Sequence, residues 1–156
     1  MTEDRNDATE LLDEADACHD AEPARAADLL RRIDMQALPA QRLPGLAFLL
    51  NHVLGEKLGA WREAWAMFTP LLQAAGDVPP PVLRRQAAAA AGLADDEGAA
   101  QLQIDAIAAA TGASPELARD AVALTQAMYR APGLPAAQAA RIVGPALAAL
   151  DRKSVV

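Results

Sequence analysis

Residue types that commonly perform chemistry are scarce in this chain of 156 residues, which has one cysteine and two histidines. Cys18 and His19 could supply a thiol nucleophile and its base. They are adjacent, however, so on a helix their side chains point about 100° apart and do not face each other. We therefore expect Cys18 to be a buried structural residue. The other histidine is His52, and two histidines without a cysteine or carboxylate cluster make a poor metal site. The sequence predicts no catalytic residue, no metal and no cofactor.

Two acidic segments, in residues 13–16 and 95–97, could be taken for paired carboxylates or for a calcium loop. Neither has the spaced oxygen ligands and the turn glycine of such a loop, so capping and surface roles are favoured. The segment Gly55-Glu56-Lys57 lacks the upstream glycine and the following Ser or Thr of a phosphate-binding loop. We therefore expect that the protein is not an enzyme.

The composition favours an all-α fold. Alanine makes up about a quarter of the chain, whereas aromatic residues make up 3%. Alanine is the best helix former, and aromatic and β-branched residues are the usual strand formers. A content of 53% apolar and 22% charged residues excludes a chain that is disordered throughout.

Turn residues divide the chain into eight predicted helices, arranged as four hairpins. Glycine, proline and N-capping residues mark the breaks, and residues 77–81, with three prolines in a row, form the firmest one. We expect one helical-repeat domain over residues 1–152 and a disordered tail at 153–156. The predicted helices cover approximately residues 7–18, 22–33, 46–58, 61–75, 80–92, 95–110, 114–131 and 135–152.

An alanine recurs in the second helix of each predicted hairpin. Ala26, Ala64, Ala99 and Ala139 are separated by 35 to 40 residues, and each is followed by an apolar residue three positions later. A small residue at this place lets the two helices of a hairpin approach closely. Internal periods of 20–50 residues are typical of stacked helical arrays.

One segment resembles the tetratricopeptide repeat. Gly59, Trp61, Ala64 and Phe68 match the turn glycine, aromatic residue, alanine and large apolar residue in the second half of that motif. The chain therefore resembles a tetratricopeptide-repeat protein with degenerate repeats. The resemblance implies a right-handed α-solenoid of about four helical hairpins with a concave groove.

In that family the groove is lined by the first helix of each hairpin and binds an extended peptide or a partner helix. When the predicted hairpins are aligned on the recurring alanine, two columns of residues are expected to face this groove. The groove would then be apolar at one end and cationic at the other. An arginine there could pair with a carboxylate of the ligand; alternatively, the arginines only solvate an exposed face. The predicted peptide-binding residues are Leu11, Leu49, Val53, Arg84, Arg85 and Arg119.

The function expected from this groove is protein–protein interaction without catalysis, as an adaptor or scaffold. One alternative is a small acidic cytosolic chaperone of the tetratricopeptide type that holds a bacterial secretion substrate. Two others are a helical enzyme with its site in the groove and a self-associating structural subunit. In the last case a second copy would cover the groove and form a homodimer.

The charge distribution bears on the partner and on the location. The net charge is −7, and all of this excess lies in residues 1–34, which hold eleven acidic and four basic residues. Such a surface repels nucleic acid and anionic membranes; it is either a solvated helix face or a steering surface for a basic partner. A single cysteine excludes an internal disulfide, and neither a signal peptide nor a membrane-spanning run is visible. We therefore expect a cytoplasmic protein.

Overall fold

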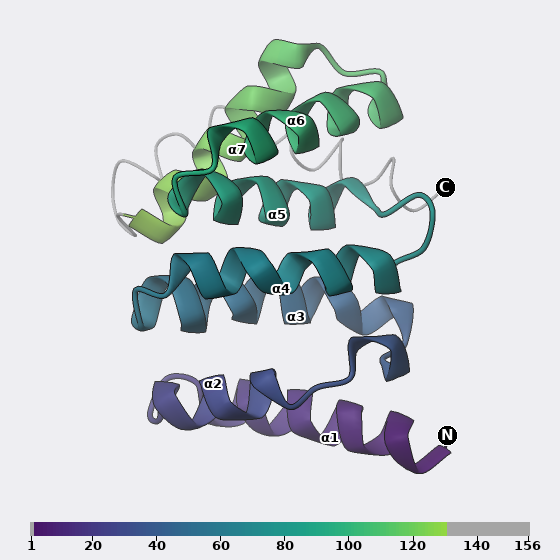
Figure 1. Cartoon of the computed structure of the whole chain (residues 1–156), viewed down its shortest axis with the longest axis vertical. Coiled ribbons are helices and arrows are strands. Elements are labelled where there is room, and N and C mark those ends of the chain that lie inside the picture. Colours follow the sequence, from purple (N-terminus) through teal and green to yellow (C-terminus); the bar gives the residue numbers. More distant parts are fainter. Residues whose placement is uncertain (1, 131–156) are drawn as a thin grey trace. The chain divides into compact units, whose positions relative to one another are not determined.

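The computed structural model describes residues 2–130 of the chain, and in this part the alanine-rich segments fold into helices that are separated by turns (Figure 1). No strand occurs among these residues, so the predicted all-α class is confirmed. The eighth predicted helix and the predicted tail lie outside the described residues. The helices are α1 (Thr2–Cys18), α2 (Pro23–Arg31), α3 (Leu43–Leu49), α4 (Trp61–Ala74), α5 (Pro81–Leu93), α6 (Glu97–Thr111) and α7 (Pro115–Arg130), with the 3-10 helices η1 (Met35–Ala37) and η2 (Ala40–Arg42) and the π-helix η3 (Leu50–Lys57).

Contacts between Cα atoms divide the chain into two compact units, Met1–Asp77 and Val78–Val156. The division falls within the proline-rich break that the sequence marks most strongly. The sequence predicted a single domain over residues 1–152. Among residues 2–130, no helix combines the length and the apolar character that a membrane span requires.

The first unit pairs helices that are neighbours in the sequence. Helix α1 packs on α2, and η3 packs on α4 and also on α2. Two of the recurring alanines, Ala26 in α2 and Ala64 in α4, have no exposed surface, as expected for residues that let helices approach closely. Arg42 at the end of η2 pairs with Asp13 of α1, which links the connection between the hairpins to the first helix.

A bidentate ion pair joins α2 to α4. The Nε atom of Arg31 lies 2.6 Å from Glu63 Oε2, and its Nη2 atom lies 2.9 Å from Glu63 Oε1. The hydrogen bonds that Arg31 donates hold the pKa of the Glu63 carboxyl below its usual range, and the same bonds raise the pKa of Arg31. Both side chains are more than a third exposed, so water screens their attraction.

The helix that the sequence predicts over residues 46–58 consists of two parts. It starts as the α-helix α3 and continues as the wider π-helix η3, which the sequence did not predict. Leu58 closes it with an N–H···O bond of 3.1 Å to the carbonyl oxygen of Val53, five residues earlier. Gly59 then takes a left-handed conformation with φ of 68°, and this ends the helix where the sequence placed its stop.

Trp61, the aromatic residue of the tetratricopeptide-like segment, lies directly against Gly55 of η3. A Cβ atom at Gly55 would overlap three atoms of the Trp61 indole ring. Gly55 is therefore required by close packing between η3 and α4. This contact lies within one hairpin.

The second unit is built around α5, whose five consecutive alanines at positions 87–91 are all fully buried. Helices α6 and α7 both pack on α5 and on each other. An apolar cluster at the contact of the three helices combines alanines with larger side chains. Its members are Ala88, Ile104, Ile107, Ala118 and Val122.

Side-chain caps start α6 and α7 close to where the sequence predicts. Asp96 accepts a hydrogen bond of 3.1 Å from the backbone N–H of Ala99, and Ser114 accepts one of 3.1 Å from that of Leu117. Helix α1 differs from its prediction, because it begins at Thr2 rather than at residue 7. The segment before residue 7 contains acidic residues, which favour a helix N-terminus.

The recurring alanine shifts by one residue in the second unit. Ala99 is only half-buried, whereas the neighbouring Ala100 is 3% exposed and takes the interior position. The fourth member of the series, Ala139, lies outside the described residues. The alanine repeat found in the sequence therefore matches the buried positions of the first unit better than those of the second.

Gly55→Ala should destabilise the first unit by about 1–3 kcal/mol, because the added methyl group overlaps a rigid indole ring. The free energy of unfolding from urea titration measures this change. Gly45→Ala in α3 is the matched control, since a Cβ atom there meets nothing within 4 Å. An equal loss in both variants would contradict the close packing of Trp61 on Gly55.

Glu63→Gln should lower the free energy of unfolding by up to about 1 kcal/mol near neutral pH, as for a well-aligned exposed pair. The folded pKa of Glu63 is depressed, so its contribution is present above the ordinary carboxyl range and is lost as the pH falls through the folded value. The difference between wild type and variant should therefore shrink in acid. Asp7→Asn, an exposed carboxylate of α1, is the control, and an acid-independent difference would count against the ion pair.

Candidate functional site

The three apolar residues predicted to bind a peptide belong to the first unit, and the structure places them in different surroundings. Leu49 is 2% exposed and Val53 has no exposed surface, so both lie in the core of the α3–η3–α4 hairpin. Leu11 of α1 is half-buried and borders a surface hollow. Of these three, only Leu11 is placed where a ligand could reach it.

The three predicted arginines belong to the second unit. Arg84 donates a hydrogen bond of 3.1 Å to Oε1 of Gln103, and Arg85 donates one of 3.3 Å to Oγ1 of Thr125. Both are half-buried between α5 and its neighbours, whereas Arg119 is exposed on α7. Arg84 and Arg85 thus hold helices of their own unit together.

The hollow beside Leu11 has a volume of about 630 Å³ and is predominantly acidic. It lies between α1 and the segment that leads from α2 to η1. Glu14 also pairs with Arg25 at 3.3 Å, and Asp34 accepts a hydrogen bond from the N–H of Gln36 at the start of η1. The hollow therefore combines a small apolar wall with several carboxylates. Its lining residues are Asp7, Ala8, Glu10, Leu11, Glu14, Arg32 and Asp34.

A second group of polar side chains, the histidine cluster, consists of His19, Asp20 and His52. His19 and Asp20 lie in the turn after α1, and His52 lies on η3. The Nε2 atoms of both histidines face the same carboxylate oxygen, Asp20 Oδ1, at 3.4 Å from His19 and 3.9 Å from His52. The two imidazole rings meet edge to face, with centroids 5.2 Å apart.

The other nitrogen of each histidine is occupied by an acceptor. His19 Nδ1 lies 2.5 Å from the backbone carbonyl oxygen of Asp16, and His52 Nδ1 hydrogen-bonds to the carboxylate of Glu56. Phe48 stacks on the His52 ring at a centroid distance of 5.1 Å and an interplanar angle of 16°. These contacts fix both rings with Nε2 directed at Asp20.

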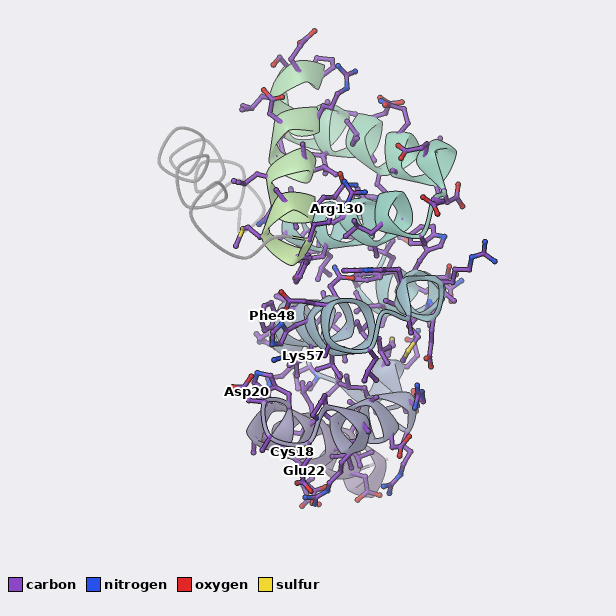
Figure 2. All side chains as sticks on the ribbon, turned by 90° about the vertical axis from the view of Figure 1, so that its left-hand side faces the viewer. Cys18, Asp20, Glu22, Phe48, Lys57 and Arg130 are labelled. Atoms are coloured by element: carbon purple, nitrogen blue, oxygen red, sulfur yellow. The ribbon has the colours of Figure 1, made fainter. Side chains whose placement is uncertain are left out.

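A cation borders the histidine cluster. Lys57 Nζ lies 3.9 Å from Asp20 Oδ1, and Figure 2 shows Asp20, Phe48 and Lys57 on the same side of the first unit. The side chain of Asp20 is 79% exposed, whereas those of His19, His52 and Glu56 are each 18% exposed. The cluster is therefore open to solvent at Asp20 and mostly covered elsewhere.

The sequence analysis did not identify this cluster because its two halves, His19–Asp20 and His52, are distant in sequence and are brought together only by the fold. The absence of an evident cysteine or carboxylate cluster led to the expectation of no metal site, but the turn after α1 brings Asp20 to both histidines. The i,i+4 spacing of His52 and Glu56 was the one local feature that could have pointed to it. The predicted burial of Cys18 is confirmed, and its thiol lies 3.8 Å from the carbonyl oxygen of Ala15.

The acidic hollow and the histidine cluster are the two features of the first unit from which a function can be inferred. No family model matches the chain, and comparisons with curated proteins and with solved structures likewise gave no match.

Proposed function

We propose that the protein is a non-catalytic protein–protein interaction module, an adaptor or scaffold, whose first unit takes a basic segment of its partner in the acidic hollow. The observation that supports this most directly is the lining of the hollow. Four carboxylates and one guanidinium surround Leu11 and Ala8 there. The hollow also lies within the region that holds all of the excess negative charge of the chain, residues 1–34.

The geometry suits a lysine or arginine side chain. The aliphatic stem of such a residue can lie against Leu11 while its charged head stays in water among the carboxylates. Asp7 and Glu10 are exposed, so their attraction acts mainly on the rate of association and on the choice of partner. Arg32, which also lines the hollow, would repel a second cation placed next to it, and this favours one orientation of the bound segment.

A basic segment is a better candidate than the acidic peptide that the sequence suggested. That suggestion depended on arginines of the second unit, and two of them are hydrogen-bonded to α6 and α7. The acidic hollow instead supports the other interpretation of the N-terminal charge, in which this surface steers a basic partner toward the protein.

For the finer fold we propose a right-handed array of tetratricopeptide-like hairpins. Packing between helices that are neighbours in the sequence supports it: α1 with α2, η3 with α4, and α5 with α6. The close contact of Trp61 with Gly55 adds support within the segment that resembles the repeat. A cytoplasmic location stays a prediction that rests on the single cysteine.

Replacing Asp7 by Asn and Glu10 by Gln should weaken binding of a short peptide of alternating Lys and Leu roughly five- to tenfold, because two exposed charge pairs are removed. Fluorescence anisotropy at low salt measures the Kd, and raising the salt concentration should weaken wild-type binding as well. A peptide with Glu in place of Lys is the ligand control.

The matched protein control is Asp77→Asn with Asp120→Asn, which removes two exposed carboxylates outside the hollow and the same net charge. If this control weakened binding as much as the first variant, only the total charge would matter and the assignment to the hollow would be wrong. The same conclusion would follow if the Glu peptide bound as tightly as the Lys peptide.

A further inference from the structure

We propose that His19, Asp20 and His52 form a binding site for one Zn²⁺ ion, with Glu56 as a positioning residue. This site is separate from the acidic hollow and goes beyond the proposed binding function. Its three ligand atoms, one from each residue, all lie within 4.8 Å of one another.

The distances are close to those that a zinc ion requires. Ligand atoms about 2.0–2.2 Å from a tetrahedral Zn²⁺ ion lie roughly 3.3–3.5 Å from each other. The separation of 3.4 Å between His19 Nε2 and Asp20 Oδ1 meets this value, and that of 3.9 Å to His52 Nε2 exceeds it slightly. Asp20 is exposed and lies in a turn, so its carboxylate has room to move closer to the His52 nitrogen.

The orientation of both imidazoles is already that of metal ligands. A ligating histidine usually donates its other ring N–H to a carboxylate or a backbone carbonyl, which fixes the tautomer and makes the ligand nitrogen more basic. Here the carboxylate of Glu56 accepts from His52 Nδ1, and the carbonyl oxygen of Asp16 accepts from His19 Nδ1. Both Nε2 atoms are thereby left as acceptors that face Asp20.

The donor set selects the class of metal. Two imidazole nitrogens and one carboxylate oxygen suit Zn²⁺ and neighbouring transition metals, whereas Ca²⁺ and Mg²⁺ prefer oxygen ligands alone. Three protein ligands leave at least one coordination position open. A water molecule or a donor atom of a partner protein can fill that position.

Lys57 has a defined role in this site. Its ammonium group lies 3.9 Å from Asp20 Oδ1, so it neutralises the carboxylate in the absence of metal and repels an incoming cation. Removing this charge should therefore strengthen zinc binding. This increase distinguishes the site from a nonspecific effect of substitution, which would weaken binding in every variant.

The first experiment is calorimetric titration of the full chain with ZnCl₂, which should show one ion per chain. The chain has only two histidines, so His19→Gln and His52→Gln should each reduce the affinity at least tenfold. Glu56→Gln should reduce it about 10- to 100-fold by releasing the His52 ring. Lys57→Gln should increase it. Cys18→Ser should leave it unchanged, which excludes thiolate ligation.

The second experiment needs no variant and so remains decisive if a substitution unfolds the chain. Histidine-ring ¹H–¹⁵N spectra of the wild-type protein should show that Zn²⁺ shifts both Nε2 resonances and leaves both Nδ1 atoms protonated. Coordination through Nδ1, no binding of Zn²⁺, or an affinity that the histidine variants do not change would overturn the proposal.

Discussion

The contact between Trp61 and Gly55 is the constraint on which the rest of the first unit depends. The indole ring occupies the space that any side chain at Gly55 would need, so η3 and α4 approach more closely than larger residues would allow. Within this hairpin, Leu50, Val53 and Leu54 fill the core, and Asn51 is buried with them. The close approach thus holds η3 in place, and η3 carries His52 and Glu56 on its less buried side.

The structure links this packing to the histidine cluster. Because η3 also packs on α2, its exposed side meets the turn that joins α1 to α2, and His52 reaches His19 and Asp20 there. The ion pair between Arg31 and Glu63 ties the same two hairpins together through α2 and α4. The acidic hollow is formed by α1 and the end of the first hairpin. The histidine cluster therefore needs a stable arrangement of these two hairpins, whereas the hollow is formed within the first hairpin alone.

Much of the secondary structure follows from local chemistry that the sequence displays. The caps at Asp96 and Ser114 and the left-handed Gly59 set helix ends near the predicted positions, because each acts within a few residues of the chain. The π-helix η3 was not predictable in this way. The sequence shows an apolar helix there, and the contact of Gly55 with Trp61 becomes apparent only once η3 and α4 are packed together.

The candidate sites were less predictable than the helices, because they too depend on how the elements pack against each other. Leu11 borders a hollow, as expected for a groove residue, but Leu49 and Val53 are core residues. The sequence shows which residues share one face of a helix, but it does not show whether a neighbouring helix covers that face. The histidine cluster joins a turn and a helix that are distant in sequence, so spacing along the chain can indicate only a part of it, such as the i,i+4 pair of His52 and Glu56.

Packing of the two hairpins in the first unit brings two distant histidines to one carboxylate, and the proposed metal site depends on this packing. Crystals grown with Zn²⁺ and measured at the zinc absorption edge would test it most directly. We expect one anomalous peak per chain, within bonding distance of both Nε2 atoms and Asp20. A chain without such a peak, or with the two histidines bound to separate ions, would contradict it.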